Sequence, residues 1–530
     1  MNQFISYLLI HVWNLITSGA RRSKKPKTAR SQTNSIQEDC VALGTIMRSP
    51  YEALSSAEQS ETELFLTAPM LLKHAILTGG TGTGKTTLML TIFRWLVKQP
   101  KTSVCLIDAR GDLLDRVLVR LAYDYTLEEL KDRLVVIDLR QDEFSSSFNI
   151  LREPGLDPYT RVSLILEILG AVWDIGVQTL QVLRACLLTI ALTDENYSLM
   201  ECEPLLVNQY FRKQLLASIT DTTLLRFWDR FDALSDTQRS QWVEPCLNRL
   251  SAWLSRPVLR NMFAQTTSLS LRRLLDERPD RIILVSLGYD ALHGDATVAG
   301  NLIVTLLLSG TMRTDKSEAE RLPVYLMLDE FENLQESSRQ LQQAIQEGRR
   351  FKVGLVCSHQ ASVQIDPKLS TLIRNVVSTQ VFYAVGGSEA DLLASQIASD
   401  QPKALMRNIL MNQRVGECIV VQRGTSKPFV RIRTQFCPDP DTSKEAVEAC
   451  RLQAFQRFGR PRQEIEAELA AREAALLHLT PSHQQLSKTG NRPQAAANPA
   501  ITLTTTTDFV EVRDSDQPKP ARTRKKKDPS

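Results

Sequence analysis

The sequence predicts an α/β protein whose mostly parallel sheet is covered by helices on both faces and is interrupted by an inserted all-α domain. Three observations point to this fold class. Near-continuous apolar runs, separated by helical stretches, begin at about residue 72, as in parallel strands that are buried on both faces. Only helical periodicity is found between residues 157 and 279, and the strand pattern stops after residue 434.

Length and composition support a folded chain of several domains. The 530 residues are about three to four times the usual domain length. Hydrophobic residues at 43% and charged residues at 23% exclude a wholly disordered, collagen-like or polytopic membrane protein. The nine cysteines form no CxxC pair, which argues against a disulfide scaffold or a zinc site and indicates a reducing compartment such as the cytosol.

The net charge of +4 is unevenly placed along the chain. Residues 21–30 and residues 519–527 each hold six basic groups and no acid. Without these twelve charges the rest of the chain carries −8, so the body is mildly acidic. Any contact of the body with nucleic acid must therefore be a local lining, not a broad basic face.

The amino-terminal region, residues 1–30, combines an amphipathic helix with a basic segment. Wound as a helix, residues 4–16 separate apolar from polar side chains, and the stretch is too short to span a membrane. Two interpretations remain open. Residues 4–30 make a peripheral membrane contact, with the cations on anionic headgroups, or the helix packs on the body or on a partner. A cleaved secretory signal is disfavoured, because its charges would precede the apolar stretch.

Residues 31–70 are expected to be a linker and lead-in, and residues 71–156 and 280–435 are expected to form the sheet domain. A glycine-rich turn follows the first predicted strand, and a helix over Lys85–Lys98 follows the turn. Each predicted strand is an apolar run bounded by polar or turn residues. The strands are His74–Thr78, Ser103–Asp108, Leu134–Leu139, Arg281–Leu287, Val324–Leu328, Val353–Ser358 and Thr379–Val385.

Three further segments complete the expected organisation. Residues 157–279 are rich in Leu, Ile and Trp at helical spacing, which predicts the inserted all-α domain. Residues 436–480 are expected to form C-terminal helices, one over Ser443–Phe458 and a second whose first turn includes Pro461. Residues 481–530 are rich in Gln, Asn, Ala, Thr and Pro and end in basic residues, which predicts a disordered basic tail.

The turn between the first strand and its helix matches the phosphate-binding loop GxxxxGK(S/T) completely. Glycines let backbone N–H groups wrap a triphosphate, the lysine reaches the outer phosphates, and the threonine hydroxyl ligates magnesium. A merely flexible glycine turn would not need the strand before it and the helix after it. The predicted nucleotide-binding residues are Gly79, Gly80, Thr81, Gly82, Thr83, Gly84, Lys85, Thr86 and Thr87, with Thr86 also a magnesium ligand.

A second predicted strand, Val324–Leu328, delivers two acids to its carboxyl end. Asp329 is placed to hold magnesium through water, and Glu330 is placed to orient and polarise an attacking water. Two acids after a strand are also common in a solvated loop. Their pairing with a phosphate-binding loop favours a nucleotide site that hydrolyses its substrate.

The carboxylate Glu330 separates water-activating ATPases from most GTPases and kinases. Asp108 to Gly111 fits the DxxG pattern of GTPases, but the chain has no (N/T)KxD motif to read guanine. ATP with Mg²⁺ is therefore the predicted nucleotide, and Asp108 is expected to be a structural or site-edge carboxylate.

Residues near the strand Val353–Ser358 add further candidates. Gln360, just past its carboxyl end, is placed to sense the γ-phosphate, and His359 is expected to be a packing neighbour. Arg349 and its neighbour Arg350 precede the strand. A cation at the developing charge accelerates phosphoryl transfer, and a neighbouring subunit supplies it in ring ATPases, although a solvated basic pair at a helix end fits equally well.

The order of these motifs resembles the FtsK/HerA superfamily of hexameric DNA-pumping ATPases. The motifs are GGTGTGKT, LIDARGD, VVIDLR, SFNIL, a helical insert, RIILVSLG, YLMLDEFENL, EGRRFKVGLVCSHQ and IRNVVSTQVFYAVG, over roughly residues 70–435. Within the superfamily the chain is most similar to the TraD/TraG-type coupling proteins of conjugation and type IV secretion. Carried over by position, the resemblance implies γ-phosphate sensing by Gln360 and an arginine, Arg349, that acts on a neighbouring subunit.

The resemblance implies a RecA-like P-loop ATPase domain that assembles as a ring, expected to be a hexamer, and hydrolyses ATP to move DNA. The implied partners are DNA and a secretion channel or relaxase complex. Coupling proteins usually begin with two membrane spans, whereas this chain has only the short helix over residues 4–16. A cytoplasmic motor, or one that is peripheral on the inner face of the cell membrane, is thus equally open. The alternatives are an ATPase that powers protein export and a nucleotide-gated cargo adaptor, which would not need Glu330.

Overall fold

The computed structural model describes residues 40–47, 63–312, 315–397, 402–424 and 429–478. The amino-terminal helix and basic segment expected over residues 1–30 lie outside these ranges, as does the tail expected over residues 481–530. Within the described ranges, no helix is both long enough and apolar enough to cross a bilayer.

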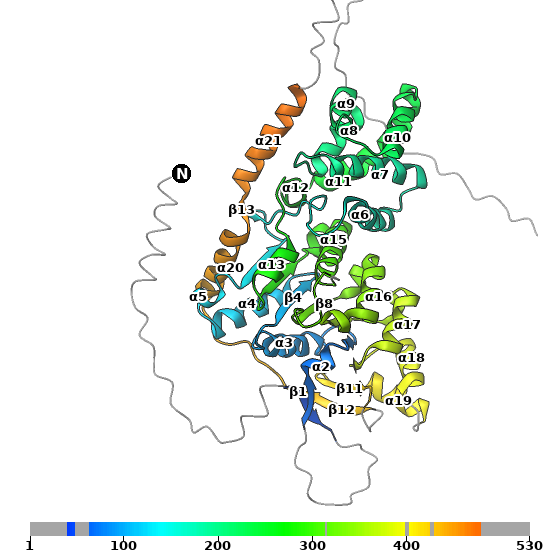
Figure 1. Cartoon of the computed structure of the whole chain (residues 1–530). Helices are drawn as coiled ribbons and strands as arrows, with labels where there is room; N and C mark the ends of the chain where they lie inside the picture. Colours follow the sequence, from blue (N-terminus) through cyan, green and yellow to red (C-terminus); the bar gives the residue numbers. More distant parts are fainter. Residues whose placement is uncertain (1–39, 48–62, 313–314, 398–401, 425–428, 479–530) are drawn as a thin grey trace, which may run out of the picture. The chain divides into compact units, whose positions relative to one another are not determined.

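A large sheet forms the centre of the fold (Figure 1). It has eleven strands in the order β2-β1-β12-β11-β10-β3-β9-β8-β4-β7-β5. The strands from β10 to β5 are parallel, and β11, β12, β1 and β2 continue the sheet in antiparallel fashion. The strands are β1 (Cys40–Ile46), β2 (Glu63–Thr67), β3 (Ala75–Thr78), β4 (Ser103–Asp108), β5 (Leu134–Asp138), β7 (Ile282–Ser286), β8 (Val324–Asp329), β9 (Val353–His359), β10 (Thr379–Phe382), β11 (Glu417–Gln422) and β12 (Val430–Thr434).

Helices cover both faces of the sheet and build the insert. Those of the sheet region are α2 (Ala68–Leu71), α3 (Lys85–Leu96), α4 (Asp112–Asp124), α5 (Leu127–Leu130), α14 (Tyr289–Leu292), α15 (Gly294–Thr311), α16 (Ser338–Glu347), α17 (Pro367–Val376), α18 (Gly387–Ile397) and α19 (Lys403–Met411). The insert contains α6 (Pro158–Trp173), α7 (Val177–Leu192), α8 (Cys202–Val207), α9 (Gln209–Leu216), α10 (Thr222–Asp232), α11 (Asp236–Leu254), α12 (Pro257–Phe263) and α13 (Leu271–Glu277). Short 3₁₀ turns are η1 (Leu199–Glu201), η2 (Phe331–Ser337), η3 (Gly348–Phe351) and η4 (Ser362–Gln364).

The parallel strands are buried on both faces, as their near-continuous apolar sequences predict. In β4, Cys105 and Ile107 belong to the core that α15 and the insert complete, whereas Val104 and Leu106 belong to the core beneath α3 and α4. The same alternation holds in β3, where Ile76 faces the first core and Leu77 faces the second. The predicted mostly parallel α/β fold is therefore confirmed.

The antiparallel part of the sheet corrects the expectation of a linker over residues 31–70. This stretch contains β1 and β2, which pair with each other, and β1 also pairs with β12. Gly44 shows why the pairing with β12 is so close, because a Cβ there would lie 2.2 Å from the carbonyl oxygen of Arg433. Edge strands with one solvated face read less clearly in sequence than buried parallel strands.

The insert contains only helices among its described residues, apart from turns and loops. Its core is continuous with that of the sheet face: Trp253 and Phe263 of the insert belong to the same buried cluster as Ile303 of α15 and Leu328 of β8. The assignment of the insert, the sheet region and the C-terminal helices to separate domains stays a prediction.

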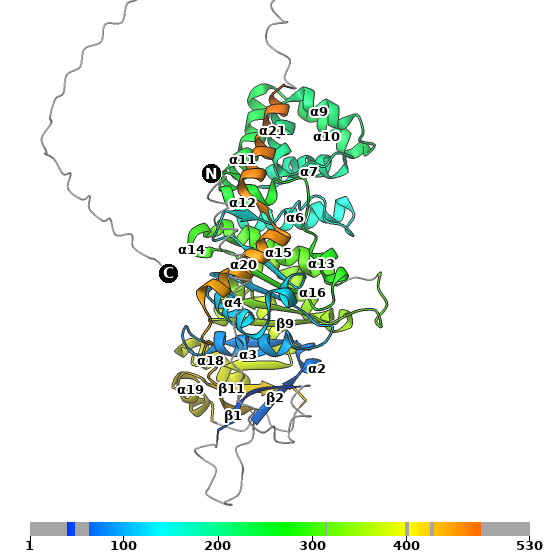
Figure 2. The same ribbon diagram turned by 90° about the vertical axis from the view of Figure 1, so that its left-hand side faces the viewer.

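Two C-terminal helices follow the sheet, and they contact different parts of the molecule. Helix α20 (Lys444–Phe458) packs against α4 and β5, and α21 (Arg462–His478) lies beside α12 of the insert (Figure 2). Between them β13 (Arg460–Pro461) pairs with β6 (Phe144–Ser145). The prediction that Pro461 lies in the first turn of the second helix is therefore wrong, because Pro461 is a strand residue and α21 begins at Arg462.

Ion pairs hold both C-terminal helices. Arg451 of α20 pairs with Asp115 of α4 at 2.8 Å and with Asp138 at the end of β5 at 3.6 Å. Arg472 of α21 pairs with the buried carboxylate of Glu201 in η1. The chain that follows the sheet therefore connects the sheet region to the insert.

Candidate nucleotide site

The phosphate-loop sequence forms the turn between β3 and α3 and needs its glycines. Gly82 and Gly84 have φ values of +74° and +119°, in the left-handed region that favours glycine. A Cβ at Gly84 would lie 3.2 Å from the ring of Tyr383 and 3.4 Å from Gly416. The backbone N–H of Gly416 also donates to the carbonyl of Thr83 at 2.9 Å, so the start of β11 lies against the loop.

Lys85 is folded back onto the loop. Its Nζ donates to the carbonyl oxygens of Gly79 at 2.6 Å and Gly80 at 2.9 Å, and the residue is only 8% exposed. Burial lowers the pKa of Lys85, against the opposing effect of nearby carboxylates. Thr86 and Thr87, in the first turn of α3, are half-buried, and Thr81 is exposed. The ammonium group thus occupies the space that the loop encloses.

Asp329 ends β8 as a buried carboxylate. The hydroxyl of Ser358 on β9 donates to its Oδ1, and so does the backbone N–H of Glu330 at 3.2 Å. Burial, together with the charges of Asp108 and Glu330, raises the pKa of Asp329 to about 6. A nearby cation stabilises the ionised form of a carboxylate in such surroundings.

Glu330 has a left-handed backbone, with φ of +50°. Its Oε2 lies 3.1 Å from Nε of Arg110, and its Oε1 accepts from Nε2 of Gln360 at 3.4 Å. A non-glycine residue at positive φ is uncommon and marks a place where the surroundings impose the backbone. The turn aims the carboxylate along the edge of the sheet, between the segments that follow β4 and β9.

Gln360 is the first residue after β9, which lies between β3 and β8 in the sheet. Its backbone N–H donates to Oε1 of Glu332 at 3.3 Å. The structure therefore brings four predicted residues to one edge: Lys85, Asp329, Glu330 and Gln360. These side chains come from segments far apart in the sequence.

Glu332 and Arg110 were not predicted as site residues. Burial raises the pKa of Glu332 to about 7, with a contribution from the charge of Glu330. Its Oε2 is buried and has no hydrogen-bond partner among the described residues. The sequence signal for Glu332 was its place two residues after Glu330. Arg110 gave no comparable signal, because its proximity to Glu330 depends on β4 and β8 being neighbours.

Two other residues have structural contacts. His359 is buried, its Nε2 lies 3.3 Å from the hydroxyl of Thr78, and its ring packs edge-on against Phe331. Burial and the charge of Lys85 lower the pKa of His359 to about 3. Asp108 accepts from the backbone N–H of Arg110 at 3.1 Å and that of Leu114 at 2.9 Å, so it fixes the start of α4.

Arg349 lies in η3 and is exposed. Within the described ranges its guanidinium makes no ion pair or side-chain hydrogen bond, and none joins it to the carboxylates of the site. Its neighbour Arg350 lies over the ring of Phe351, with 5.6 Å between the guanidinium carbon and the ring centroid. The structure thus leaves Arg349 outside the cluster of its own chain.

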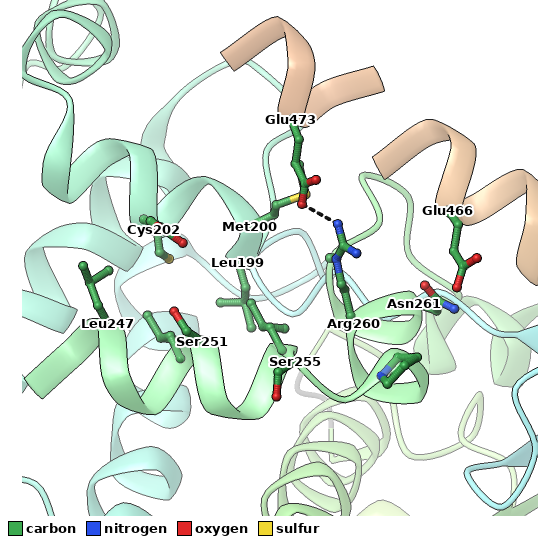
Figure 3. A pocket seen from close by; sticks show the side chains of 15 residues that line it. Leu199, Met200, Cys202, Leu247, Ser251, Ser255, Arg260, Asn261, Glu466 and Glu473 are labelled. Atoms are coloured by element: carbon green, nitrogen blue, oxygen red, sulfur yellow. Dashed lines mark hydrogen bonds and ion pairs between the residues drawn. The ribbon is translucent and has the colours of Figure 1, made fainter. Parts of the chain in front are cut away.

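A cavity of about 330 Å³ lies elsewhere, between the insert and α21 (Figure 3). Its lining includes Leu247, Ser251, Glu466, Arg260 and Glu473, and the last two form an ion pair. None of the phosphate-loop or carboxylate residues lines this cavity, so it is distinct from the candidate nucleotide site.

Comparisons with known proteins found one family model and several solved structures that are similar to this chain. Residues 53–206 match the family model of the central domain of the helicase HerA. The plasmid coupling protein TrwB in complex with ADP and Mg²⁺ superposes with a TM-score of 0.54 at 14% identity, over 77% of this chain and 97% of TrwB. TrwB with a non-hydrolysable ATP analogue gives a TM-score of 0.53 at 15% identity, over 76% of this chain and 96% of that one.

A further solved structure, VirB4 of Thermoanaerobacter pseudethanolicus, has a TM-score of 0.50 at 11% identity, over 75% of this chain and 97% of VirB4. None of the curated proteins compared with the chain matches it in sequence. The predicted resemblance to the FtsK/HerA superfamily is therefore confirmed: residues 53–206 match the HerA family model, and the fold is similar to that of TrwB.

Proposed function

We propose that the chain is an ATP-driven DNA translocase of the conjugative coupling type, which works as a ring and hydrolyses ATP to move DNA. The observation that carries the proposal is the meeting of Lys85, Asp329, Glu330 and Gln360 at one edge of the sheet. The set supplies a cation for the outer phosphates, two carboxylates and an amide, which are the groups that ATP hydrolysis requires.

The residues of the loop fit a bound nucleotide with Mg²⁺. Lys85 now satisfies the carbonyls of Gly79 and Gly80, and a phosphate group would offer its Nζ a stronger, charged partner. The hydroxyl of Thr86 and the buried carboxylate of Asp329 are the donors expected to hold Mg²⁺. When bound, Mg²⁺ neutralises charge on the phosphate oxygens. The complexes of TrwB with ADP and Mg²⁺ and with an ATP analogue support this assignment.

Each residue of the candidate site then has a defined role. Gly79 to Thr87 bind the phosphates through backbone N–H groups and the helix N-terminus. Glu330 orients a water and accepts its proton at a carboxylate oxygen, and Gln360, bonded to Glu330, senses the γ-phosphate. Arg349, exposed and unpaired within the described part of its own chain, reaches the site of a neighbouring subunit.

The assembly follows from the same proposal. The ring is a hexamer with DNA in its centre, and a secretion channel or a relaxase complex is the further partner. The protein acts in the cytoplasm, with peripheral contact to the inner face of the cell membrane through residues 4–30.

The test compares ATP hydrolysis by the full chain without DNA, with single-stranded DNA and with double-stranded DNA. DNA should raise the rate. Glu330→Gln should lower kcat by a factor of about 10² to 10⁴ while ATP still binds, because the amide keeps the shape of the site but accepts no proton. Lys85→Ala should lose ATP binding. The control Glu445→Gln, at an exposed position on α20, should keep the wild-type rate.

Other outcomes decide between the proposal and its rivals. Hydrolysis that DNA leaves unchanged, but that an unfolded secreted polypeptide stimulates, would favour an ATPase for protein export. Binding of ATP without any hydrolysis would favour a nucleotide-gated adaptor. Either result would overturn the DNA translocase.

A further inference from the structure

We propose that Arg110 is a positioning residue for Glu330: its guanidinium holds the carboxylate in the orientation from which it activates water. The proposal rests on the proposed ATP hydrolysis. It starts from the ion pair between Nε of Arg110 and Oε2 of Glu330, at 3.1 Å.

The register of the sheet places these two residues together. β4 and β8 are adjacent and parallel, and Asp108 pairs with Asp329 across them. The segments that leave the two strands at the same edge therefore run side by side, with Arg110 two residues past Asp108 and Glu330 one residue past Asp329. The contact follows from the topology and does not depend on a chance surface arrangement.

The backbone that carries Arg110 is held from two sides. Oδ1 of Asp108 accepts from the N–H of Arg110 at 3.1 Å, within a turn that ends at Gly111 with φ of +108°. On the other side, the N–H of Tyr289 donates to the carbonyl of Ala109 at 2.9 Å. A side chain mounted on such a turn presents its guanidinium from a fixed base.

Glu330 needs an orienting partner because it lies among other acids. Asp329 and Glu332 are close enough for their charges to interact with that of Glu330, and Lys85 is committed to the loop carbonyls. Within the described ranges, Arg110 is the cation that forms an ion pair with Glu330. Gln360 holds the other carboxylate oxygen at 3.4 Å. The carboxylate is thus fixed at both oxygens, by a cation and by an amide.

This ion pair is too exposed to serve mainly stability. The side chain of Arg110 is 48% exposed, and exposed ion pairs contribute little to the free energy of unfolding. Orientation, by contrast, has a large effect on rate, since displacement of a reacting group by about 1 Å costs about 10²-fold. The second acid near Arg110, Asp290 at 3.5 Å, is itself 73% exposed and competes weakly.

The test measures kcat and KM for ATP, together with ATP affinity, in the full chain. Arg110→Ala should lower kcat about tenfold to a hundredfold and change KM and affinity less than about twofold, because Arg110 does not contact the phosphate loop. Arg110→Lys should recover part of the rate, because it keeps the charge but loses the planar fork. Arg116→Ala is the matched control: this arginine of α4 pairs with Asp439 away from the site and should leave kcat unchanged.

A double variant shows whether Arg110 acts through Glu330. In the Glu330→Gln background, Arg110→Ala should lower the residual rate by less than about twofold, since residues that act as a unit are not additive. Full additivity would overturn the proposal, as would an unchanged or higher kcat in Arg110→Ala. If Arg110→Ala fails to fold, Arg110→Lys takes its place, and the expected fall in kcat is then smaller because the charge is kept. Absence of hydrolysis by the wild-type chain would overturn both the proposed function and this role. If the wild type hydrolyses ATP and substitution of Arg110 leaves the rate unchanged, only the role of Arg110 is overturned.

Discussion

Carboxylates gather at the carboxyl edge of β4 and β8 in greater number than the cations that could balance them. Asp108, Asp329, Glu330 and Glu332 interact electrostatically there, and burial raises the pKa values of Asp329 and Glu332 to about 6 and about 7. Such an excess of negative charge without a bound cation is costly to the folded chain. It is the arrangement expected of a site that gains its balancing charge from a ligand.

The raised pKa of Glu332 predicts a pH dependence of stability in the nucleotide-free chain. The folded state keeps the proton of Glu332 up to about pH 7, whereas the unfolded chain releases it near 4.5, so this residue lowers stability as pH rises between these values. In Glu332→Gln, the fall in the free energy of unfolding over this pH range should be smaller by about 1–3 kcal/mol. Thermal melts at pH 5 and pH 8 measure it, with Glu445→Gln as the control. An unchanged pH slope in Glu332→Gln would contradict the prediction.

At the residue scale, the parts of the site that are contiguous in sequence could be predicted. The phosphate loop and the pair Asp329 and Glu330 are local patterns attached to a strand, and Gln360 also follows a strand. Arg110 escaped prediction because its partner lies 220 positions away and meets it only through strand order. Glu332 escaped because its burial depends on η2 folding over the edge of the sheet.

At the element scale, η2 is tied to α15 by a buried polar contact. The N–H of Ser337 donates to Oδ1 of Asn301 at 2.7 Å, and the hydroxyl of Ser337 donates to the same oxygen at 2.8 Å. Both residues are fully buried. The N–H of Asn333, also in η2, donates to the carbonyl of Glu330 at 3.1 Å. The position of Glu330 is therefore linked to α15 through one short element.

Asn301→Leu tests this link between elements. The substitution keeps the branching of the side chain at Cγ but leaves the buried N–H of Ser337 without its acceptor, which should cost about 1–3 kcal/mol of stability. Thermal melting detects the change as a lower Tm. Asn412→Ala, at an exposed position at the end of α19, should shift the Tm little. If Asn301→Leu and the wild type have the same Tm, the buried contact makes no net contribution to stability.

Elements were predictable where hydrophobic periodicity was strong. All seven predicted strands are present, and β4 was predicted with its correct bounds, because buried parallel strands are apolar throughout. The strands β1, β2, β11 and β12 were missed. In β12, half-exposed and charged residues such as Arg431 and Arg433 interrupt the apolar ones, and the pairing with β1 joins segments nearly 400 residues apart.

At the scale of the whole molecule, the proposed ring makes a prediction about Arg349. Rings assembled from Lys85→Ala subunits mixed with Arg349→Ala subunits should regain part of the hydrolysis that neither variant shows alone, because some interfaces then combine an intact loop with an intact arginine. The measurement is the ATPase rate of mixtures against each variant alone. Mixtures that assemble but stay inactive would show that Arg349 does not act on a neighbour.

The two C-terminal helices have a mechanical consequence for the insert. The chain connects the insert to the sheet region at two points, before α6 and after α13. Two connections alone would allow the insert to rotate about the line between them. The ion pairs of Arg451 on α20 and of Arg472 on α21 add a third connection. A rotation of the insert relative to the sheet region would therefore break contacts of α21, including the ion pair between Arg472 and Glu201. The C-terminal helices therefore add a second set of contacts between the sheet region and the insert, beyond the two chain connections.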